Sequence, residues 1–565
     1  MISAGSAIAQ ERPLAPEIAT NTDQKQAVTG QKFMAVTAHP EATNAAYKIL
    51  EQGGSAADAG IAAQLVLGLV EPQSSGLGGG AFALYFDAKD SLLYTYDARE
   101  TAPQSAGPYL FQKDDGELMG FFDAAIGGRA VGVPGVPKLL EQLHEKFGKA
   151  DWKLLFNDAI AFAEDGFIVS DRMNTMLKGQ HQYFGIDTKT KLFFFPDGSH
   201  PVEGTINNPD YALTLRDLQR NKTSNFYSGE IAQNIVQKVR ESSKRGLLST
   251  EDLQDYEVIE REAVCGNYRG YQVCSMGQPS SGGLTLLIAL GILENFDLMA
   301  LGDDNPQSYH LIAEASRLAF ADRNHYMADP DFVATPDTLL LQDIYLDVRA
   351  QEIKNDSVIR YANHGIPLGW NDEKQMKDGT VKDSGTTHMT IVDQYGNVLS
   401  MTSSIEFAFG SHLMVNGFLL NNQLTDFSFR ASDGKGNKVA NRVQGGKRPR
   451  SSMAPVIVFD PDGKPFMALG SAGGSRIIGY VLQRIIAAID WSMELQASID
   501  APHLLHRGKK LEVEKGGEQY VAPLKDLGHE LYFGEMNSGL TAIKFEDGNI
   551  IGAANPRRDG TAMGQ

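Results

Sequence analysis

The sequence has little cysteine, no long apolar run and no excess of positive charge. Two cysteines in 565 residues exclude a fold that depends on a dense disulfide framework. The longest apolar candidate, residues 481–495, is interrupted by charged and amide side chains and falls short of the ~18 residues that span a membrane. The 51 basic and 70 acidic residues give a net charge of −19, which disfavours nucleic acid and anionic membrane surfaces as partners. We therefore expect no membrane span and no nucleic-acid partner.

The rest of the composition is that of a globular protein, with 42% hydrophobic and 21% charged residues. The length corresponds to about three or four domains of ordinary size. Glycine is in excess at 58 residues, which predicts many tight turns and places where the backbone approaches a ligand closely.

The N-terminus has features of an export signal. Residues 1–9 are small and apolar, and Ala7-Ile8-Ala9 has the small-x-small form of a signal-peptidase site. The segment lacks a charged beginning and is short, so a disordered tail is the alternative. Residues 10–30 are polar and contain proline, as flexible leaders do. We interpret residues 1–30 as an export-signal remnant with a flexible leader, and expect a periplasmic or secreted protein.

The pattern of elements changes along the chain. The first two-thirds favour helices with two hairpins, whereas hairpins prevail from Thr386 onward. Strands joined in hairpins indicate antiparallel sheets, arranged either as two domains or as stacked layers of helix and sheet. The expected helices are 39–52, 56–70, 137–147, 152–164, 229–244, 284–295, 307–326 and 475–490, and the expected strands are 81–86, 92–97, the hairpin 263–275, 387–393, 398–404, 454–459 and 466–469.

Two glycine-rich loops invite a ligand-binding interpretation. Residues 76–81 fit the GxGxxA pattern of dinucleotide-binding proteins, but a helix precedes them and a strand follows, which is the reverse of the required order. Residues 470–474 lie between a predicted strand and a predicted helix. That order directs backbone N–H groups and a helix N-terminus at one point, which suits an anion or a developing oxyanion. A plain strand-to-helix turn is the alternative.

Metal and cofactor motifs are missing. There is no HExxH and no GxSxG, and His503 and His506 have no cysteine or acidic cluster beside them. We expect no metal site and no cofactor. Cys265 and Cys274 lie on opposite arms of a predicted hairpin, where they could form a disulfide in an exported protein. Directly opposed strand positions do not always suit the geometry of that bond, so a free pair is the alternative.

Thr386 stands at the start of a predicted strand, after a polar loop. If the chain were cut before it, one residue would present a hydroxyl and a free α-amine together. An α-amine has a pKa of about 7.7–8.0 and can act as the base that activates the hydroxyl. The alternative is that Thr386 only opens a strand.

Several segments together favour Thr386 as a nucleophile over a residue that only opens a strand. They resemble segments of the γ-glutamyltranspeptidase family, and they occur in the same order as in that family from about residue 33 to residue 560. The segment after Gly385 resembles the start of the family's small subunit. The matching segments are Gly78-Gly79-Gly80, Arg99-Glu100-Thr101-Ala102-Pro103, Tyr268-Arg269-Gly270-Tyr271, Pro279-Ser280-Ser281-Gly282-Gly283, Gly385-Thr386-Thr387-His388, Leu419-Leu420-Asn421-Asn422-Gln423, Asp426-Phe427-Ser428, Lys447-Arg448-Pro449, Ser451-Ser452-Met453-Ala454-Pro455 and residues 470–477.

The resemblance implies an α+β fold, a four-layer αββα sandwich with stacked antiparallel sheets, as in N-terminal-nucleophile hydrolases. It implies a precursor that cuts itself between Gly385 and Thr386 into a large subunit, residues 31–385, and a small subunit, residues 386–565. The two would form one intertwined heterodimer.

The resemblance also implies a reaction. Thr386 would attack the γ-glutamyl amide of a donor such as glutathione, and water or the amine of an amino acid or peptide would resolve the acyl-enzyme. The implied site residues are Thr402 as a helper hydroxyl, the amides of Gly473 and Gly474 for the oxyanion, Arg99, Ser451 and Ser452 for the α-carboxylate, and Gln423 and Asp426 for the α-ammonium.

The sequence departs from the family pattern at three places. Ser404 stands where a second assisting threonine is expected, with the hydroxyl retained. Glu406 stands where several relatives have an asparagine that touches the α-amino group, so that a carboxylate there adds attraction for an ammonium. Residues 429–446, the implied lid, are short and lack a tyrosine that closes the site in some relatives. A more open pocket would admit larger acyl or acceptor groups.

Two alternatives remain to be weighed. The family includes acylases that act on glutaryl-cephalosporins and need no ammonium site, whereas Gln423, Asp426 and Glu406 favour γ-glutamyl substrates. A non-catalytic protein that binds glutamate-like ligands would not need Thr386 beside a complete pocket.

Overall fold

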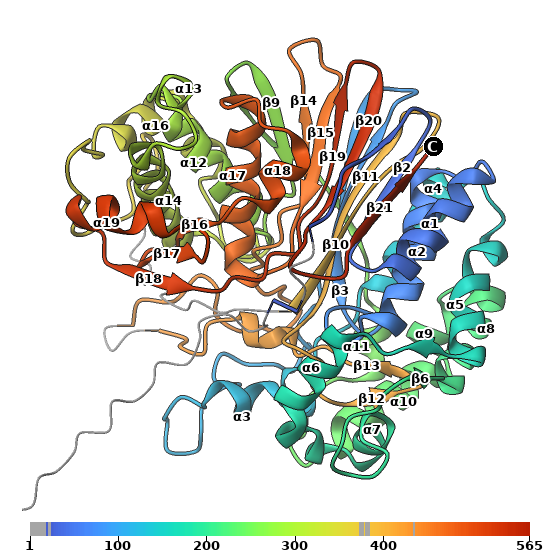
Figure 1. Ribbon diagram of the computed structural model, residues 1–565. Coiled ribbons are helices and arrows are strands. Elements are labelled where there is room, and N and C mark those ends of the chain that lie inside the picture. Colours follow the sequence, from blue (N-terminus) through green and yellow to red (C-terminus); the bar gives the residue numbers. More distant parts are fainter. Residues whose placement is uncertain (1–18, 21–23, 372–377, 379–384, 433–435) are drawn as a thin grey trace, which may run out of the picture.

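Two seven-stranded sheets stack face to face between two layers of helices in the computed structural model (Figure 1). The structure describes residues 19–20, 24–371, 378, 385–432 and 436–565. The expected four-layer αββα sandwich is therefore confirmed. In the part of the chain that the structure describes, no helix is both long and apolar enough to cross a bilayer.

Both sheets are antiparallel throughout, as the hairpin pattern predicted. The first contains, in spatial order, β1 (Val28–Gly30), β20 (Asn549–Ala554), β19 (Thr541–Glu546), β15 (Pro465–Gly470), β14 (Val456–Phe459), β9 (Tyr271–Ser275) and β8 (Val264–Tyr268). The second contains β21 (Thr561–Gly564), β2 (Met34–Thr37), β10 (Gly385–Val392), β11 (Val398–Glu406), β3 (Gly80–Asp87), β4 (Leu92–Ala98) and β7 (Ile259–Arg261).

One helical layer covers the outer face of the second sheet. Its innermost member, α2 (Ala56–Val70), is apolar on all sides and packs on β10 and β11, and a capping box between Ser55 and Asp58 starts it. Further helices on this side include α1 (Pro40–Glu51), α4 (Val136–Phe147), α5 (Asn157–Asp165), α6 (Asp171–Gln180), α8 (Pro209–Asn221) and α10 (Glu230–Glu241).

The other layer covers the first sheet. Here α12 (Gly282–Leu293) is also apolar all round, because it lies between β8 and β9 on one side and α14 and α17 on the other. The main helices of this layer are α12, α14 (Pro306–Tyr326), α16 (Asp343–Ala350), α17 (Ile477–Ile489) and α18 (Leu495–Asp500). A small sheet of β16 (Leu504–His506), β17 (Leu511–Glu514) and β18 (Leu531–Gly534), with α19 (Glu518–Asp526), packs at its edge.

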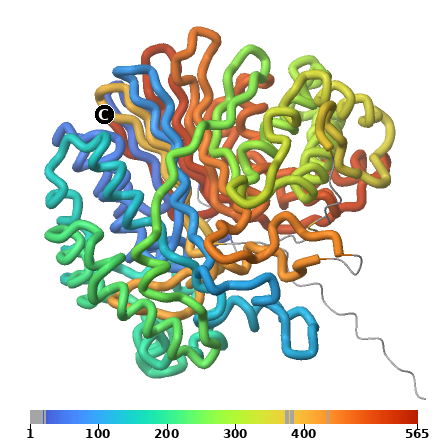
Figure 2. The backbone as a smooth tube through the Cα atoms, turned by 180° about the vertical axis from the view of Figure 1, so that it is seen from behind, coloured from blue at the N-terminus to red at the C-terminus, as the bar shows by residue number. Residues whose placement is uncertain are grey.

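The two halves expected from self-cleavage share both sheets. Strand β10 lies between β2 and β11, with Thr390 opposite Val36. Strand β14 pairs with β9, with Val456 opposite Ser275. Figure 2 shows strands from the beginning and the end of the chain side by side in the sheets. Separate domains for the two halves are thus excluded, because each half supplies strands that the other half needs.

Three local expectations can be compared with the structure. Cys265 and Cys274 are bonded across the β8–β9 hairpin, which settles the open alternative. Strand β1 begins inside the segment expected to be a flexible leader, because its backbone pairs with β20, while residues 1–18 and 21–23 lie outside the described residues. The helix expected from Trp152 begins as a 3-10 turn to Phe156 before α5 follows.

Candidate active site

Thr386 lies at the edge of a small cavity between the sheets and the loops below them. The pairing of Thr386 with β11 is irregular, because Ser404 and Ile405 both lie opposite this one residue. Such a β-bulge changes the direction in which the neighbouring side chains point. Thr386 is 1% exposed, and its Oγ1 has no hydrogen-bond partner among the described residues. Arg558 Nη1 donates to its carbonyl oxygen at 3.0 Å. A buried hydroxyl without a partner, facing a cavity, is poised for a ligand or for reaction.

The peptide bond before Thr386 is polarised by a neighbouring hydroxyl. Ser404 Oγ donates to the carbonyl oxygen of Gly385 at 2.7 Å and accepts from the backbone N–H of Glu406 at 2.8 Å. The second bond fixes the direction of the first. A donor at this carbonyl would stabilise negative charge on the oxygen if Thr386 attacked the carbon.

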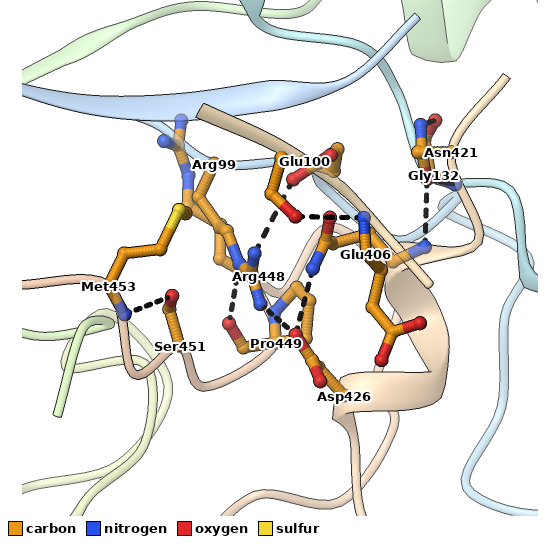
Figure 3. A network of polar contacts seen from close by, with 12 residues as sticks. Arg99, Glu100, Gly132, Glu406, Asn421, Asp426, Arg448, Pro449, Ser451 and Met453 are labelled. Carbon is orange, nitrogen blue, oxygen red and sulfur yellow. Dashed lines mark hydrogen bonds and ion pairs between the residues drawn. The ribbon is translucent and has the colours of Figure 1, made fainter. Parts of the chain in front are cut away.

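A positive and a negative side chain, Arg99 and Asp426, line the same cavity as Thr386. Arg99 Nη2 donates to Asp426 Oδ2 at 2.5 Å, and Gln423 Nε2 donates to the same oxygen at 2.8 Å (Figure 3). Arg99 Nε also bonds the carbonyl oxygen of Pro449 at 3.1 Å. The cavity therefore presents a guanidinium and a carboxylate side by side, which is the pattern that an α-amino acid requires.

A small separate core holds Gln423 and Asp426 in place. Both belong to a 3-10 turn, Gln423–Asp426, in which Leu424 points away from the cavity into apolar surroundings. Phe429 stacks on Phe111 nearby, with ring centroids 4.5 Å apart. The members of this core are Ala102, Ala106, Phe111, Ala124, Ala130, Leu424, Phe427 and Val443. It includes described parts of the expected lid, residues 429–446, of which 433–435 lie outside the described residues.

The two serines expected to bind a carboxylate line the same cavity. Ser451 Oγ accepts from the N–H of Met453 at 3.1 Å, and Ser452 Oγ accepts from Arg323 at 2.7 Å. Arg323 and Arg450 also line the cavity, and the sequence did not predict either. Arg323 lies in a helix that is buried almost throughout, and none of the sequence motifs includes it.

The second glycine loop reaches the cavity in part. Gly474 lines it together with Ser475, whereas Gly473 is not among the lining residues. Gly473 has φ +129°, and a Cβ there would lie 2.7 Å from the Tyr480 ring, so glycine is needed for the turn. A 3-10 turn, Gly474–Arg476, leads into α17. The order of strand, loop and helix agrees with the sequence prediction.

Two predicted site residues lie elsewhere. Thr402 does not line the cavity, because its Oγ1 is hydrogen-bonded to His388 Nδ1 at 2.8 Å inside the sheet. Burial lowers the pKa of His388 to about 3, which keeps this imidazole neutral. Glu406 is fully buried and accepts from Asn422 Nδ2 at 2.8 Å, outside the cavity wall. It has φ +78°, so its backbone turns the chain away after β11. Neither side chain is among the residues that line this cavity.

The first glycine patch serves close packing beside the site. A Cβ on Gly79 would lie 2.2 Å from the carbonyl oxygen of Ser404, and one on Gly78 would lie 2.1 Å from that of Leu419. Strand β11 and the segment before Gln423 can approach only because these residues lack side chains. Among the described residues, no group of three or more His, Cys, Asp or Glu is placed to hold a metal ion.

Comparisons with known proteins extend over almost the whole chain. A family model described as gamma-glutamyltranspeptidase matches residues 42–565. The glutathione hydrolase proenzyme of Bacillus subtilis (strain 168) is 35% identical over 555 residues, which cover 96% of this chain and 93% of that protein. The acylase ACY 1 proenzyme of Pseudomonas sp. (strain V22) is 31% identical, with 97% of this chain and 96% of that protein covered. The crystal structure of cephalosporin acylase from Bacillus halodurans superposes with a TM-score of 0.83 at 25% identity, over 100% of this chain and 99% of that one.

Proposed function

The chain belongs to the γ-glutamyltranspeptidase family, and on that premise we propose that Thr386 is the nucleophile of a γ-glutamyltransferase and glutathione hydrolase. The observation that carries this proposal is the unpartnered Thr386 hydroxyl in a cavity that also holds Arg99 and Asp426. The relatives' names as proenzymes fit a chain that must be cut before it works.

The first reaction is the cut between Gly385 and Thr386. Thr386 Oγ attacks the Gly385 carbonyl carbon, the carbon–nitrogen bond breaks, and the proton passes from the hydroxyl to the departing amine. The product is an ester, which water hydrolyses to leave a carboxylate on Gly385 and a free amine on Thr386. Ser404 supports the step through its bond to the Gly385 oxygen. The result is a heterodimer of residues 31–385 and 386–565, held together by the shared sheets.

The freed amine then acts as the base for turnover. Thr386 attacks the γ-carbonyl of the donor, its proton moves to the α-amine and on to the leaving amine, and a γ-glutamyl ester remains on the hydroxyl. Water releases glutamate from this ester, or an acceptor amine takes the γ-glutamyl group. We assign the oxyanion to the amides of Gly473 and Gly474, and the position of Gly474 on the cavity wall supports this assignment.

The substrate class follows from the charges opposite Thr386. Arg99, Ser451 and Ser452 offer donors to an α-carboxylate, and Asp426 with Gln423 offers acceptors to an α-ammonium. A glutaryl group has no ammonium, so it would leave the Asp426 carboxylate without a cationic ligand. We therefore assign γ-glutamyl donors such as glutathione, with amino acids or peptides as acceptors, rather than glutaryl-cephalosporins.

The experiment compares γ-glutamyl-p-nitroanilide with glutaryl-p-nitroanilide on the wild type and on Asp426→Asn. We expect the wild type to prefer the γ-glutamyl compound. The substitution should raise the KM for the γ-glutamyl compound about ten- to hundredfold, which corresponds to the loss of one charge-assisted hydrogen bond. The KM for the glutaryl compound should change little. A wild type that prefers the glutaryl compound would instead identify an acylase.

We also propose that the protein acts in the periplasm or outside the cell. The signal-like start of the sequence and the Cys265–Cys274 bond support this, since disulfides persist mainly in oxidising compartments. Fractionation of the native host, with detection of the cut protein in the periplasm or medium, tests it.

A further inference from the structure

Arg323 is a cavity residue for which the reaction above has no role. It lies near the end of α14 and is 6% exposed, with its guanidinium at the cavity wall. Nη2 donates to Ser452 Oγ at 2.7 Å, and Nε donates to Ser281 Oγ at 2.8 Å. The bond to Ser452 joins a helix of the large subunit to the small subunit, whereas Ser281 belongs to the large subunit itself.

Arg323 has no ion-pair partner in the part of the chain that the structure describes. Three arginines line the cavity, and two of them have acidic partners: Arg99 pairs with Asp426 at 2.5 Å, and Arg450 pairs with Asp378 at 3.0 Å. None of the ion pairs formed by the described residues includes Arg323. Burial, and then the charge of Arg450, lower the pKa of Arg323, while the carboxylates of Asp378 and Asp426, which form no ion pair with it, oppose the fall. An anionic ligand in the cavity would supply the missing charge.

The bond to Ser452 also sets the direction of that hydroxyl. A guanidinium can only donate, so Ser452 Oγ is the acceptor and its own proton must point elsewhere. No hydrogen bond donated by Ser452 Oγ is found within the described part of the chain. Because Ser452 lines the cavity, its proton is available for donation to a ligand there.

Arg323 is also connected to Ser451, through the hydroxyl of Ser281. Ser281 Oγ accepts from Arg323 and donates to the carbonyl oxygen of Ser451 at 2.5 Å. The Ser451 hydroxyl in turn accepts from the N–H of Met453, which leaves its proton free to be donated. One guanidinium thus holds the backbone of the first serine and orients the hydroxyl of the second.

We propose that Arg323 is a positioning residue that makes Ser451 and Ser452 donors to the substrate α-carboxylate and adds a positive charge that attracts this carboxylate. The proposal rests on the γ-glutamyl specificity proposed above. It predicts that Arg323 contributes to binding of the carboxylate, and not to the attack by Thr386.

The experiment measures kcat and KM of Arg323→Met and Arg323→Lys with γ-glutamyl-p-nitroanilide and with its analogue whose α-carboxylate is a carboxamide. For Arg323→Met we expect the KM of the carboxylate compound to rise tenfold or more, with kcat changed less than threefold and the KM of the carboxamide nearly constant. Arg323→Lys should recover part of the loss, because it keeps the charge but not both hydrogen bonds. Arg317→Met is the matched control, since Arg317 lies on the same helix and pairs with Glu314.

Coupling to Ser452 separates this role from general damage. Ser452→Ala should raise the KM of the carboxylate compound in the wild type and add little in the Arg323→Met background. Equal KM increases for both compounds, a fall in kcat alone, or additive effects of the two substitutions would overturn the proposal. If Arg323→Met fails to mature into two subunits, the same comparison of KM values for the two compounds on Arg323→Lys tests the proposal. A wild type that does not distinguish carboxylate from carboxamide would refute the proposed function itself, independently of Arg323.

Discussion

The hydroxyl of Ser404 donates a 2.7 Å hydrogen bond to the carbonyl oxygen of Gly385, the residue that precedes the nucleophile. The bulge in β11 produces this contact by placing two residues opposite Thr386. In the self-cleavage proposed above, this bond would stabilise the negative charge that forms on the Gly385 oxygen.

Replacement of that donor should slow self-cleavage. For Ser404→Ala we expect the rate of maturation to fall about 10²- to 10³-fold, the usual cost of removing one oxyanion donor. The measurement is a gel time course of precursor and subunits after synthesis. Ser403→Ala is the matched control, because Ser403 bonds Gln64 instead of the cut site. Equal rates for Ser404→Ala and the wild type would contradict this role.

Substitution of Thr386, the proposed nucleophile, tests the mechanism most directly. Thr386→Ala should remain one uncut chain and form no acyl-enzyme, since both reactions need the same hydroxyl. Thr386→Ser should be cut and should retain activity, because the hydroxyl and the freed amine are kept. N-terminal sequencing of the smaller band of the wild type should begin at Thr386. Cleavage in the alanine variant would exclude the mechanism.

Glu100 should make stability depend on pH. Burial raises its pKa to about 8, although Arg99, 3.8 Å away, opposes the rise, and the unfolded value is 4.5. The folded state therefore binds the proton more tightly. Its contribution to stability is complete below about pH 4.5, declines as the pH rises toward 8, and is lost above that.

Urea unfolding of the mature protein between pH 5 and pH 9, compared with Glu100→Gln, measures this effect. The glutamine variant should lose less stability than the wild type as the pH rises, because its side chain cannot ionise. Glu117→Gln is the exposed control and should follow the wild type. A glutamine variant with the wild-type pH dependence would exclude Glu100 as the cause.

The disulfide should stabilise the protein without affecting catalysis. Cys265 and Cys274 are nine residues apart and close the β8–β9 hairpin at the edge of its sheet. In the chain-entropy account such a short loop contributes about 2–3 kcal/mol. The double serine variant should unfold at a lower temperature and keep kcat and KM, as measured by calorimetry and by the p-nitroanilide assay. A loss of activity at low temperature would show that the hairpin supports the site.

The sequence predicted elements well where the pattern was local and strong. The apolar helix after Ser55 and the hairpin around Arg269-Gly270 begin and end close to the expected residues. Site residues followed from motifs for Thr386, Arg99 and Asp426, which the structure brings to one cavity. Motifs did not reveal which side of a strand or turn a residue would occupy.

Thr402 and Glu406 illustrate that motifs do not reveal which way a side chain will point. Both come from the strand that also carries Ser404, yet of these three only Ser404 lines the cavity. Thr402 is bonded to His388 inside the sheet, and Glu406 follows the bulge with a positive φ. Local sequence carries no signal for such a shift. Arg323 was missed for a related reason, since its partner Ser452 is 129 residues away along the chain.

The sequence by itself determined the antiparallel sheets, through its hairpin pattern, and the family, through its motifs, because both are written in neighbouring residues. The layered fold and Thr386 as the expected nucleophile followed from the resemblance that those motifs carry. The tertiary structure alone decided which polar groups meet: Ser404 with the Gly385 carbonyl, Arg99 with Asp426, and Arg323 with Ser452. The first pair lies on adjacent strands of one sheet, and the other two pairs join segments 327 and 129 residues apart in the chain. The polarity and charge of the cavity therefore result from packing, and not from any one stretch of the chain.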